Sequence, residues 1–478
     1  QWLSPSQTSG GVQPFLFTQC QAIHARSVIP LQDTPCVRFR FSAEITIPAG
    51  LKALMAASST GRSESGQKAV ETFEMPQAIP SYLFAFAVGD LASRELGPRS
   101  RVWAEPQMLD AAAYEFAKVD DMLRKAEQLL GPYEWDRFDL LTMPPSFPYG
   151  GMENPRLTFL TPTLLAGDRS LANVLTHELA HSWTGNLVTN ATNEHFWLNE
   201  GFTVYAERLI EEALEGAEVS ELHMALGHRR LKSAIEGFSD RPELTKLRTH
   251  LSGIDPDEAF SEVPYEKGFL FLRAIEEHAG RKKFLDFLKA YIRHFRFSSI
   301  TTEEFVDFTE KELPGALSGV QAQKWIDGIG IPENCPQPRS KRLKTILDTG
   351  SSVPEFNIGS AWMPCEWALY LGNLPASTPL SACEELERRF QLTSTNNCEI
   401  LVSWLTVAIN SGYLKVLDRC KEVLGKVGRM KYLKPLYTAL ASRSETRDLA
   451  RELFSKNRAG YHPIAQQVVE NLLRKYQA

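Results

Sequence analysis

Two histidines and a glutamate in this chain are spaced as metal ligands. In the segment "THELAHSW" (176–183), His177 and His181 are four residues apart, so on a helix both imidazoles lie on one face. Glu200 follows after an 18-residue spacer and completes the pattern HExxH-x18-E. Zinc sites of this type use three protein ligands and leave a fourth position for water. We therefore predict that these residues bind one Zn2+ per chain; an ordinary helix with two histidines is the alternative.

Two more glutamates are placed to support this metal. Glu178 is next to a predicted ligand in sequence, so its carboxylate would lie beside the zinc rather than on it. Zinc lowers the pKa of bound water toward about 7, and a neighbouring carboxylate can take the water's proton. Glu207, seven residues after Glu200, is expected either to hold a ligand histidine or to form a solvated salt bridge. The pattern predicts hydrolysis of a peptide or an ester.

The helix that carries the histidines must also attach to a core. Leu171, Val174, Leu175 and Leu179 gather on one side of it, about a third of a turn from the histidines. We expect that side to face the core and Gly185 to end the helix as its C-cap.

The rest of the chain predicts an α+β multidomain protein. Alternation over "VRFRFSAEITI" (37–47) predicts a half-buried strand, and 15–21 and 82–91 look similar, so residues 1–90 are expected to form a β-rich domain. Helical spacing dominates from 111–131 onward, interrupted by the extended segment "MPPSFPYGGMENP" (143–155). We predict a catalytic domain over 91–332, a Gly- and Pro-rich linker over 333–342 and an α-helical domain over 343–478.

Composition and charge restrict the class of protein. Of 478 residues, 43% are apolar and 23% charged, as in globular domains with sizeable cores. The formal net charge of −6 comes without a long basic run, so we expect no nucleic-acid binding, and no apolar run is long enough for membrane insertion. The seven cysteines form no CxxC pair, which favours free thiols in a reducing compartment, the cytoplasm.

Four motifs give the chain a resemblance to a known family. The segments "PYGGMENP" (148–155), "HELAHSWTGNLVT" (177–189), "FWLNEGFTVY" (196–205) and "VPYEKG" (263–268) resemble the zinc aminopeptidases of the gluzincin type. The resemblance extends to "GRMKYLKPLY" (428–437) and is closest to the branch of leukotriene A(4) hydrolase and aminopeptidase B. It implies a β-rich N-terminal domain, which this sequence enters partway, a thermolysin-like, mainly helical zinc domain and an α-helical C-terminal domain.

The resemblance also implies roles for individual residues. Glu153 would bind the free α-ammonium of a peptide, and Tyr265 would donate a hydrogen bond to the developing oxyanion. The glycines of "YGGM" would let a substrate strand approach the backbone. The implied substrate-binding residues are Gln19 and Gln21, with Gln21 preferred, Tyr149, Gly150, Gly151, Met152 and Glu153, together with Arg429 and Lys431 for the carboxylate end of short peptides.

Three functions remain open at this point. The first is a monomeric zinc aminopeptidase acting on short peptides. The second adds an epoxide hydrolase acting on a fatty-acid epoxide, because Asp257 in "IDPDEAF" matches the aspartate that this branch uses for epoxide opening. Phe260, Arg156 and Asn193 depart from the branch and are expected to change the pocket lining. The third is a non-catalytic peptide-binding or scaffold protein.

Overall fold

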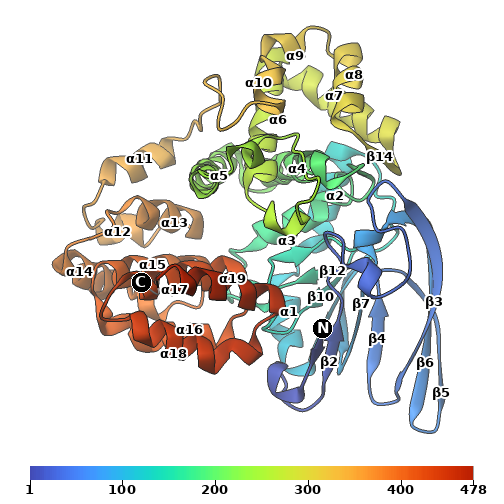
Figure 1. Ribbon diagram of the computed structural model, residues 1–478, viewed down its shortest axis with the longest axis horizontal. Helices are drawn as coiled ribbons and strands as arrows, with labels where there is room; N and C mark the ends of the chain where they lie inside the picture. The colour runs from blue at the N-terminus through green and yellow to red at the C-terminus, as the bar shows by residue number, and fades with distance from the viewer. Residues whose placement is uncertain (477–478) are drawn as a thin grey trace.

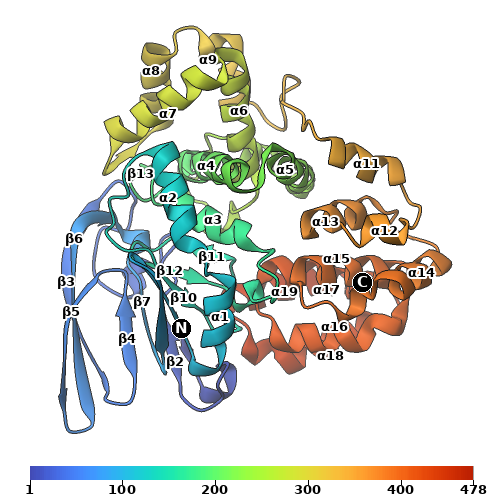
Figure 2. The same cartoon turned by 180° about the vertical axis from the view of Figure 1, so that it is seen from behind.

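The chain folds into three regions that follow one another in sequence, in agreement with the predicted α+β multidomain architecture. The computed structural model describes residues 1–476. Two β-sheets form the first region, a mixed sheet with helices forms the second, and helices alone form the third (Figure 1). Helices α3 and α4, which carry the predicted zinc ligands, lie between the sheets and the C-terminal helices in both views (Figure 2).

The first region consists of two antiparallel sheets. A four-stranded sheet has the order β1 (Trp2–Leu3), β2 (Phe15–Phe17), β7 (Phe86–Gly89) and β4 (Lys52–Met55). A three-stranded sheet has the order β3 (Arg38–Pro48), β6 (Lys68–Pro80) and β5 (Ser58–Ser65). The predicted alternating strand is confirmed as β3, whose Phe39, Phe41, Ala43 and Ile45 pack against the core. The other two predicted strands are shorter than expected, because 18–24 turns away from the sheet and Ser81–Leu83 form a 3-10 turn.

The second region is built on a five-stranded sheet. Its order is β11 (Gly151–Met152), β12 (Leu157–Leu160), β10 (Asp139–Thr142), β9 (Ser100–Ala104) and β8 (Ala92–Gly97), with β9, β10 and β12 parallel. A short parallel pair, β13 (Val188–Asn190) and β14 (Ser298–Ile300), lies apart from it. The helices are α1 (Leu109–Glu115), α2 (Val119–Leu130), α3 (Ala172–Ala180), α4 (Trp197–Glu215), α5 (Ala217–Gly237), α6 (Gly268–Ala279), α7 (Arg281–Phe295), α8 (Thr302–Glu312), α9 (Ala316–Gly319) and α10 (Ala322–Ile326).

One local expectation for this region is confirmed and one needs correction. The helical spacing over 111–131 corresponds to α1 and α2, and α2 packs against α4. Gly185 is not the C-cap of α3, because the helix already ends at Ala180 with His181 as its cap. Gly185 instead lies in the following turn at φ +113°, where a Cβ atom would be 2.5 Å from Asn199 Oδ1.

The third region has a hydrophobic core of its own. Its helices are α11 (Lys341–Thr349), α12 (Phe356–Gly359), α13 (Pro364–Asn373), α14 (Leu380–Phe390), α15 (Cys398–Asn410), α16 (Leu417–Lys426), α17 (Met430–Ser442), α18 (Arg447–Asn457) and α19 (Pro463–Arg474). One continuous core joins the first two regions, whereas the third forms a second core that takes only a few residues of α5. None of the helices in residues 1–476 has the length and apolar character needed to cross a bilayer.

A short loop connects the third region to the second at the backbone level. The Gly428 amide donates to the Pro145 carbonyl at 2.8 Å, and the Met430 amide donates to Pro148 at 2.9 Å. Gly428 is required for this approach, because a Cβ atom would lie 2.6 Å from the Pro145 oxygen. The Pro-rich segment that leads to Gly150 is therefore held to the third region by two backbone hydrogen bonds.

Candidate metal centre and active site

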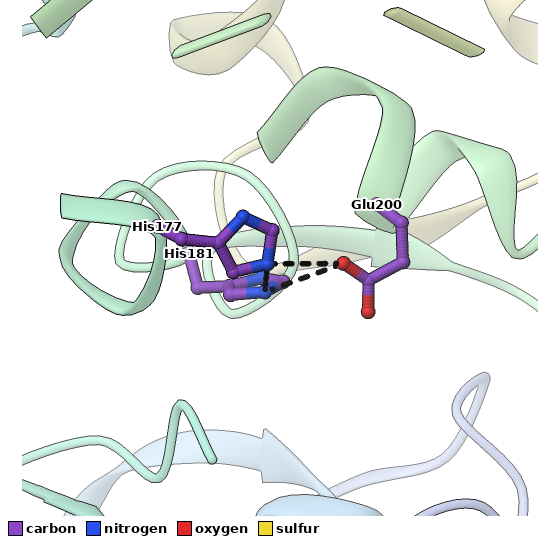
Figure 3. A group of neighbouring side chains, drawn as sticks. All are labelled: His177, His181 and Glu200. Atoms are coloured by element: carbon purple, nitrogen blue, oxygen red, sulfur yellow. Dashed lines mark hydrogen bonds and ion pairs between the residues drawn. The ribbon is translucent and has the colours of Figure 1, made fainter. Parts of the chain in front are cut away.

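The three predicted zinc ligands converge on one point (Figure 3). His177 Nε2 and His181 Nε2 are 3.1 Å apart, and each is 3.4 Å from Glu200 Oε2. A tetrahedral zinc ion with bonds of about 2.0–2.2 Å separates its ligand atoms by about 3.3–3.6 Å. His181 and Glu200 are buried, and Glu200 Oε2 accepts no hydrogen bond within the described part of the chain. The donor set and its spacing fit zinc.

The second nitrogen of each ligand histidine is held by the protein. His177 Nδ1 is 2.8 Å from Glu207 Oε2, which is the first of the two alternatives that the sequence left open for Glu207. His181 Nδ1 is 3.1 Å from the Thr184 carbonyl and 3.1 Å from Thr203 Oγ1. A proton on Nδ1 in each ring leaves the Nε2 lone pair free for a metal. Sequence reasoning did not find the two threonines: Thr184 acts through its backbone carbonyl, and Thr203 belongs to no motif that was interpreted.

Glu178 lies beside the ligand cluster in a tight, dry position. Its side chain is buried, and burial raises its pKa to about 7, although the neighbouring histidines act in the opposite direction. Gly151 makes this position possible, because a Cβ atom there would be 2.4 Å from Glu178 Oε1. A carboxylate with a pKa near neutrality is suited to accept and return a proton.

Glu153 brings a second buried carboxylate to the same place. It is 4% exposed, and its Oε1 atom has no hydrogen-bond partner within residues 1–476. Its ligand atom lies within 4.8 Å of those of Glu178 and His181. Burial raises the pKa of Glu153, because the ionised carboxylate is poorly solvated there; a cation bound beside it would favour the ionised form. The Asn186 side chain positions this residue by donating to its backbone carbonyl at 2.7 Å.

Tyr265 faces the ligands from a π-helical turn, η9 (Val263–Lys267). Its ring stacks on His177 with centroids 6.1 Å apart and an interplanar angle of 21°. Burial raises the pKa of Tyr265 well above its usual value, so the phenol stays a neutral donor. Helices α4 and α6 approach each other closely at Gly201 and Gly268. A side chain would prevent this approach, because a Cβ atom on Gly201 would be 2.7 Å from Gly268 Cα.

Comparison with known proteins places this geometry in a family. The chain matches the models of the peptidase M1 N-terminal domain over 4–83, the peptidase family M1 domain over 114–325 and the leukotriene A4 hydrolase C-terminal domain over 362–473. It is 41% identical to leukotriene A-4 hydrolase of Xenopus laevis over 98% of this chain and 80% of the relative. The chain belongs to peptidase family M1. This makes it an enzyme of the zinc metallopeptidase class and sets aside the non-catalytic alternative.

Two further relatives agree with the branch inferred from the sequence. This M1 peptidase is 39% identical to aminopeptidase B of Rattus norvegicus over 99% of its own length and 76% of the relative. Its structure superposes on yeast leukotriene A4 hydrolase in complex with bestatin with a TM-score of 0.89 and 34% identity, covering 99% of this chain and 80% of that one. The predicted family, branch and three-part fold are confirmed.

A cavity of this M1 peptidase is lined by Phe196 and Phe260, whose rings contact Tyr265. It has an empty volume of about 620 Å³, counting space open to solvent. The residues of its lining that concern the site are Gln21, Tyr149, Asn193, Phe196, Asp257 and Phe260. Asp257 Oδ2 is 2.8 Å from His24 Nε2, a partner that the sequence did not suggest. Gln19 lies outside this lining; its Nε2 atom is 3.3 Å from Met152 Sδ and its Oε1 atom is buried without a partner within residues 1–476.

One residue expected to change the lining does not reach it. Arg156 adopts φ +67° and points away, with Nη1 3.1 Å from Asp136 Oδ2 and Nη2 3.2 Å from Gln77 Oε1. The expectation was wrong because the guanidinium finds acidic and amide partners between the first two regions. Asn193 and Phe260 do line the cavity.

The two basic residues of the C-terminal region behave differently from each other. Arg429 packs against the "YGG" backbone, since a Cβ atom on Gly150 would be 2.5 Å from its Nη2. It donates to Tyr432 Oη at 3.2 Å. Lys431 forms an ion pair of 2.5 Å with Glu399, which also accepts from Tyr432. Although burial alone would raise it, Lys431 and Arg429 hold the pKa of Glu399 at about 2. Sequence reasoning missed Glu399.

Proposed function

We propose that this M1 peptidase removes the N-terminal residue from short peptides. The observation that carries the proposal is the unpartnered, buried carboxylate oxygen of Glu153 beside the cluster of His177, His181 and Glu200. An α-ammonium paired with Glu153 would put the first peptide bond of a substrate next to the ligands and fix the position of the cut. Exclusion of water from this carboxylate strengthens the attraction to a cation.

The chain's own residues divide the reaction between them. His177, His181 and Glu200 would hold one zinc ion per chain, which when bound activates water and polarises the carbonyl. Glu178 would accept the proton of the attacking water and return it to the leaving amine. Tyr265 would donate a hydrogen bond to the oxygen that gains negative charge. The backbone of Gly150 and Gly151 would align the substrate strand.

Further contacts to the substrate would come from all three regions, with Gln21 or Gln19 at the amino end. Gln21 and Tyr149 lie on the cavity wall. Gln19 contacts Met152, the residue that precedes Glu153 in the chain. Arg429 is the better candidate for a peptide carboxylate, because Lys431 already has a carboxylate partner within the protein. We propose substrates of a few residues, since the Arg429 guanidinium lies against Gly150, three positions before Glu153 in the chain.

The test compares one tripeptide with a free N-terminus and the same tripeptide N-acetylated, each with and without a zinc chelator. We expect cleavage of the free peptide only, its loss on chelation and its return when zinc is added. Glu153→Gln should lower kcat/KM for the free peptide about 100-fold, the effect of losing a charge-assisted contact to a buried site. Glu74→Gln, the same change on an exposed strand position, is the control. Equal cleavage of both peptides would contradict the proposal.

A second activity is favoured by one observation. Asp257 lies on the wall of the cavity together with Phe260, Phe196 and Ala259, so a carboxylate faces an otherwise largely apolar space. We propose that this space accepts a fatty-acid epoxide and that Asp257 directs water to it. Chromatography should show a diol from a lipid epoxide with the native chain and none with Asp257→Asn. Glu258→Gln, at the exposed neighbouring position, should behave as the native chain does. Absence of diol from the native chain would remove this activity.

The remaining expectations from the sequence stand as proposals with some structural support. We propose domains over 1–90, 91–332 and 343–478 with a linker over 333–342; the sheet changes between Gly89 and Ala92, and the described chain between α10 and α11 contains no helix or strand. We also propose a monomer in the cytoplasm. All seven cysteines are free thiols, which suits a reducing compartment.

A further inference from the structure

An acidic residue of α15 reaches across to the basic residues at the start of α17. Helices α15 and α17 pack against each other in the third region and lie side by side in both views (Figures 1 and 2). Arg429 and Lys431 belong to the start of α17, and Glu399 belongs to the first turn of α15. An acidic residue in a first turn stabilises its own helix. The side chain of Glu399 has partners on the other helix, which indicates a second role.

Two groups of α17 converge on one oxygen of Glu399. Lys431 Nζ donates to Glu399 Oε1 at 2.5 Å, and the Tyr432 hydroxyl donates to the same atom at 2.7 Å. The Tyr432 oxygen in turn accepts a hydrogen bond from Arg429 Nη1 at 3.2 Å. A chain of hydrogen bonds therefore leads from Glu399 to the guanidinium that lies against Gly150.

The backbone that carries Glu399 is attached to the second region as well. Asn397 Oδ1 accepts from the Glu399 amide at 3.0 Å, and Asn397 Nδ2 donates to Ser170 Oγ, in the segment before α3, at 2.7 Å. The side chains of Glu399 and Lys431 are 21% and 39% exposed. The ion pair is thus fixed in position and can still be approached by a ligand.

The groups joined by these hydrogen bonds carry unequal charges. Arg429 and Lys431 supply two positive charges, and Glu399 supplies one negative charge. Although burial acts in the opposite direction, Lys431 and Arg429 hold the pKa of Glu399 at about 2, so the carboxylate is ionised at neutral pH. The remaining positive charge attracts a peptide carboxylate less strongly than the two cations would without Glu399.

We infer that Glu399 is a specificity-determining residue, which pairs with Lys431 and so weakens the preference for peptides with a free carboxylate over peptides with a neutral C-terminal end. The inference rests on the proposed aminopeptidase function and on Arg429 as its carboxylate site. The Tyr432 hydroxyl keeps the Arg429 guanidinium in place, while Lys431 is occupied within the protein. Peptides that end in an amide are therefore substrates next to those that end in a carboxylate.

The experiment compares a tripeptide with its C-terminal amide by steady-state kinetics. Glu399→Gln removes the negative charge and keeps a side-chain oxygen for the Tyr432 hydroxyl. We expect KM to fall about fivefold for the tripeptide and to change less than about twofold for the amide, because only the carboxylate responds to the added positive charge. Glu422→Gln removes a carboxylate of α16 that is paired with Lys426 at 2.8 Å, and this matched control should change neither KM.

Lys431→Met tests whether Glu399 occupies the lysine. On the native chain it should raise KM for the tripeptide about threefold, and on the Glu399→Gln chain about tenfold, because the lysine is then unpaired. A tenfold rise on the native chain would overturn the inference even if the Glu399 variant does not fold. An equal effect of Lys431→Met on both chains, or an equal effect of Glu399→Gln on the tripeptide and its amide, would also overturn it.

The proposed function can fail separately from this inference. If the native chain cleaves neither peptide, the aminopeptidase proposal fails, and titration calorimetry of the same two peptides decides the role of Glu399. We then expect Glu399→Gln to lower the Kd of the tripeptide relative to that of its amide about fivefold. An unchanged ratio of the two Kd values would overturn the inference.

Discussion

The predicted metal ligands and the proposed peptide-binding residues of this enzyme are positioned in different ways. His177, His181 and Glu200 come from two consecutive helices that pack on each other inside one core. The proposed peptide-binding residues come from the loop after β2, from the Pro-rich segment and from the loop before α17. The first set is fixed by helix geometry within a few turns of chain, whereas the second depends on how three regions dock. Variants in the two sets should therefore fail in different ways.

The largest effect is expected at the proton-accepting carboxylate. Glu178→Gln keeps the shape of the side chain and leaves the three ligands intact, so zinc should remain bound. Turnover should fall by about 10²–10⁴-fold, the usual contribution of a general base. Metal analysis and kcat for a free tripeptide measure the two quantities. A variant with normal kcat would show that Glu178 is not the base.

Substitutions of Gly150 and Gly151 are expected to have smaller effects, each on a different kinetic constant. Gly151→Ala would place a methyl group 2.4 Å from Glu178 Oε1, and the displaced carboxylate should lower kcat roughly 10-fold to 100-fold, since small misplacements of catalytic groups are costly. Gly150→Ala meets the flexible end of Arg429 instead, so it should raise KM with little change in kcat. Steady-state kinetics of both variants give the comparison. The same pattern in both would mean that the two residues act on one group.

Arg429 and Lys431 test the contribution of the third region to peptide binding. Arg429→Met should raise KM for a tripeptide with a free carboxylate about tenfold, and Lys431→Met should raise it only about threefold, because Lys431 is already paired with Glu399. The tripeptide amide is the control substrate and should respond to neither variant. A larger effect for Lys431 would show that its ion pair opens when substrate binds.

The smallest effect concerns stability and pH. The hydrogen bond to Asp257 raises the pKa of His24, so this pair stabilises the fold fully below the ordinary histidine value of about 6.5 and loses its effect as pH rises through the raised pKa. Both side chains are about one-third exposed, which limits the contribution to less than about 1 kcal/mol. Melting curves of His24→Asn should fall below those of the native chain at pH 5.5 and match them at pH 9.

Asp257→Asn provides the second half of that test. It should show the same pH dependence, and the double variant should add nothing to it, since both changes remove one interaction. A difference between variant and native chains that persists at pH 9 would mean that His24 stabilises the loop by packing and not by charge.

Sequence reasoning succeeded where a local rule decides position. The helical period fixes His177 against His181, and strict alternation located β3 almost to the residue. It failed for Gly185, because the end of a helix depends on contacts that the sequence pattern does not show. Here α3 ends at Ala180, and the His181 side chain contacts the Thr184 carbonyl in the turn that follows. It failed for Arg156 because the choice between facing a cavity and facing Asp136 depends on residues 20 or more positions away.

The sequence pattern also does not predict which residues from distant segments contact each other. The contact of His24 with Asp257 spans 233 positions, and that of Lys431 with Glu399 joins two helices of the C-terminal region. Neither follows any periodicity. The resemblance to M1 peptidases supplied roles for Glu153 and Tyr265, and the structure adds what holds them, namely Asn186 and the π-helical turn.

The two backbone hydrogen bonds from Gly428 and Met430 to the Pro-rich segment have a mechanical consequence. Such bonds are short and directional, so the helical region cannot slide along the segment by even an ångström without breaking both. The segment continues directly into Gly150 and Gly151, the second of which presses on Glu178. A displacement of the last third of the chain would therefore be passed through this segment to the backbone next to Glu178, although that part of the chain supplies none of the three predicted metal ligands.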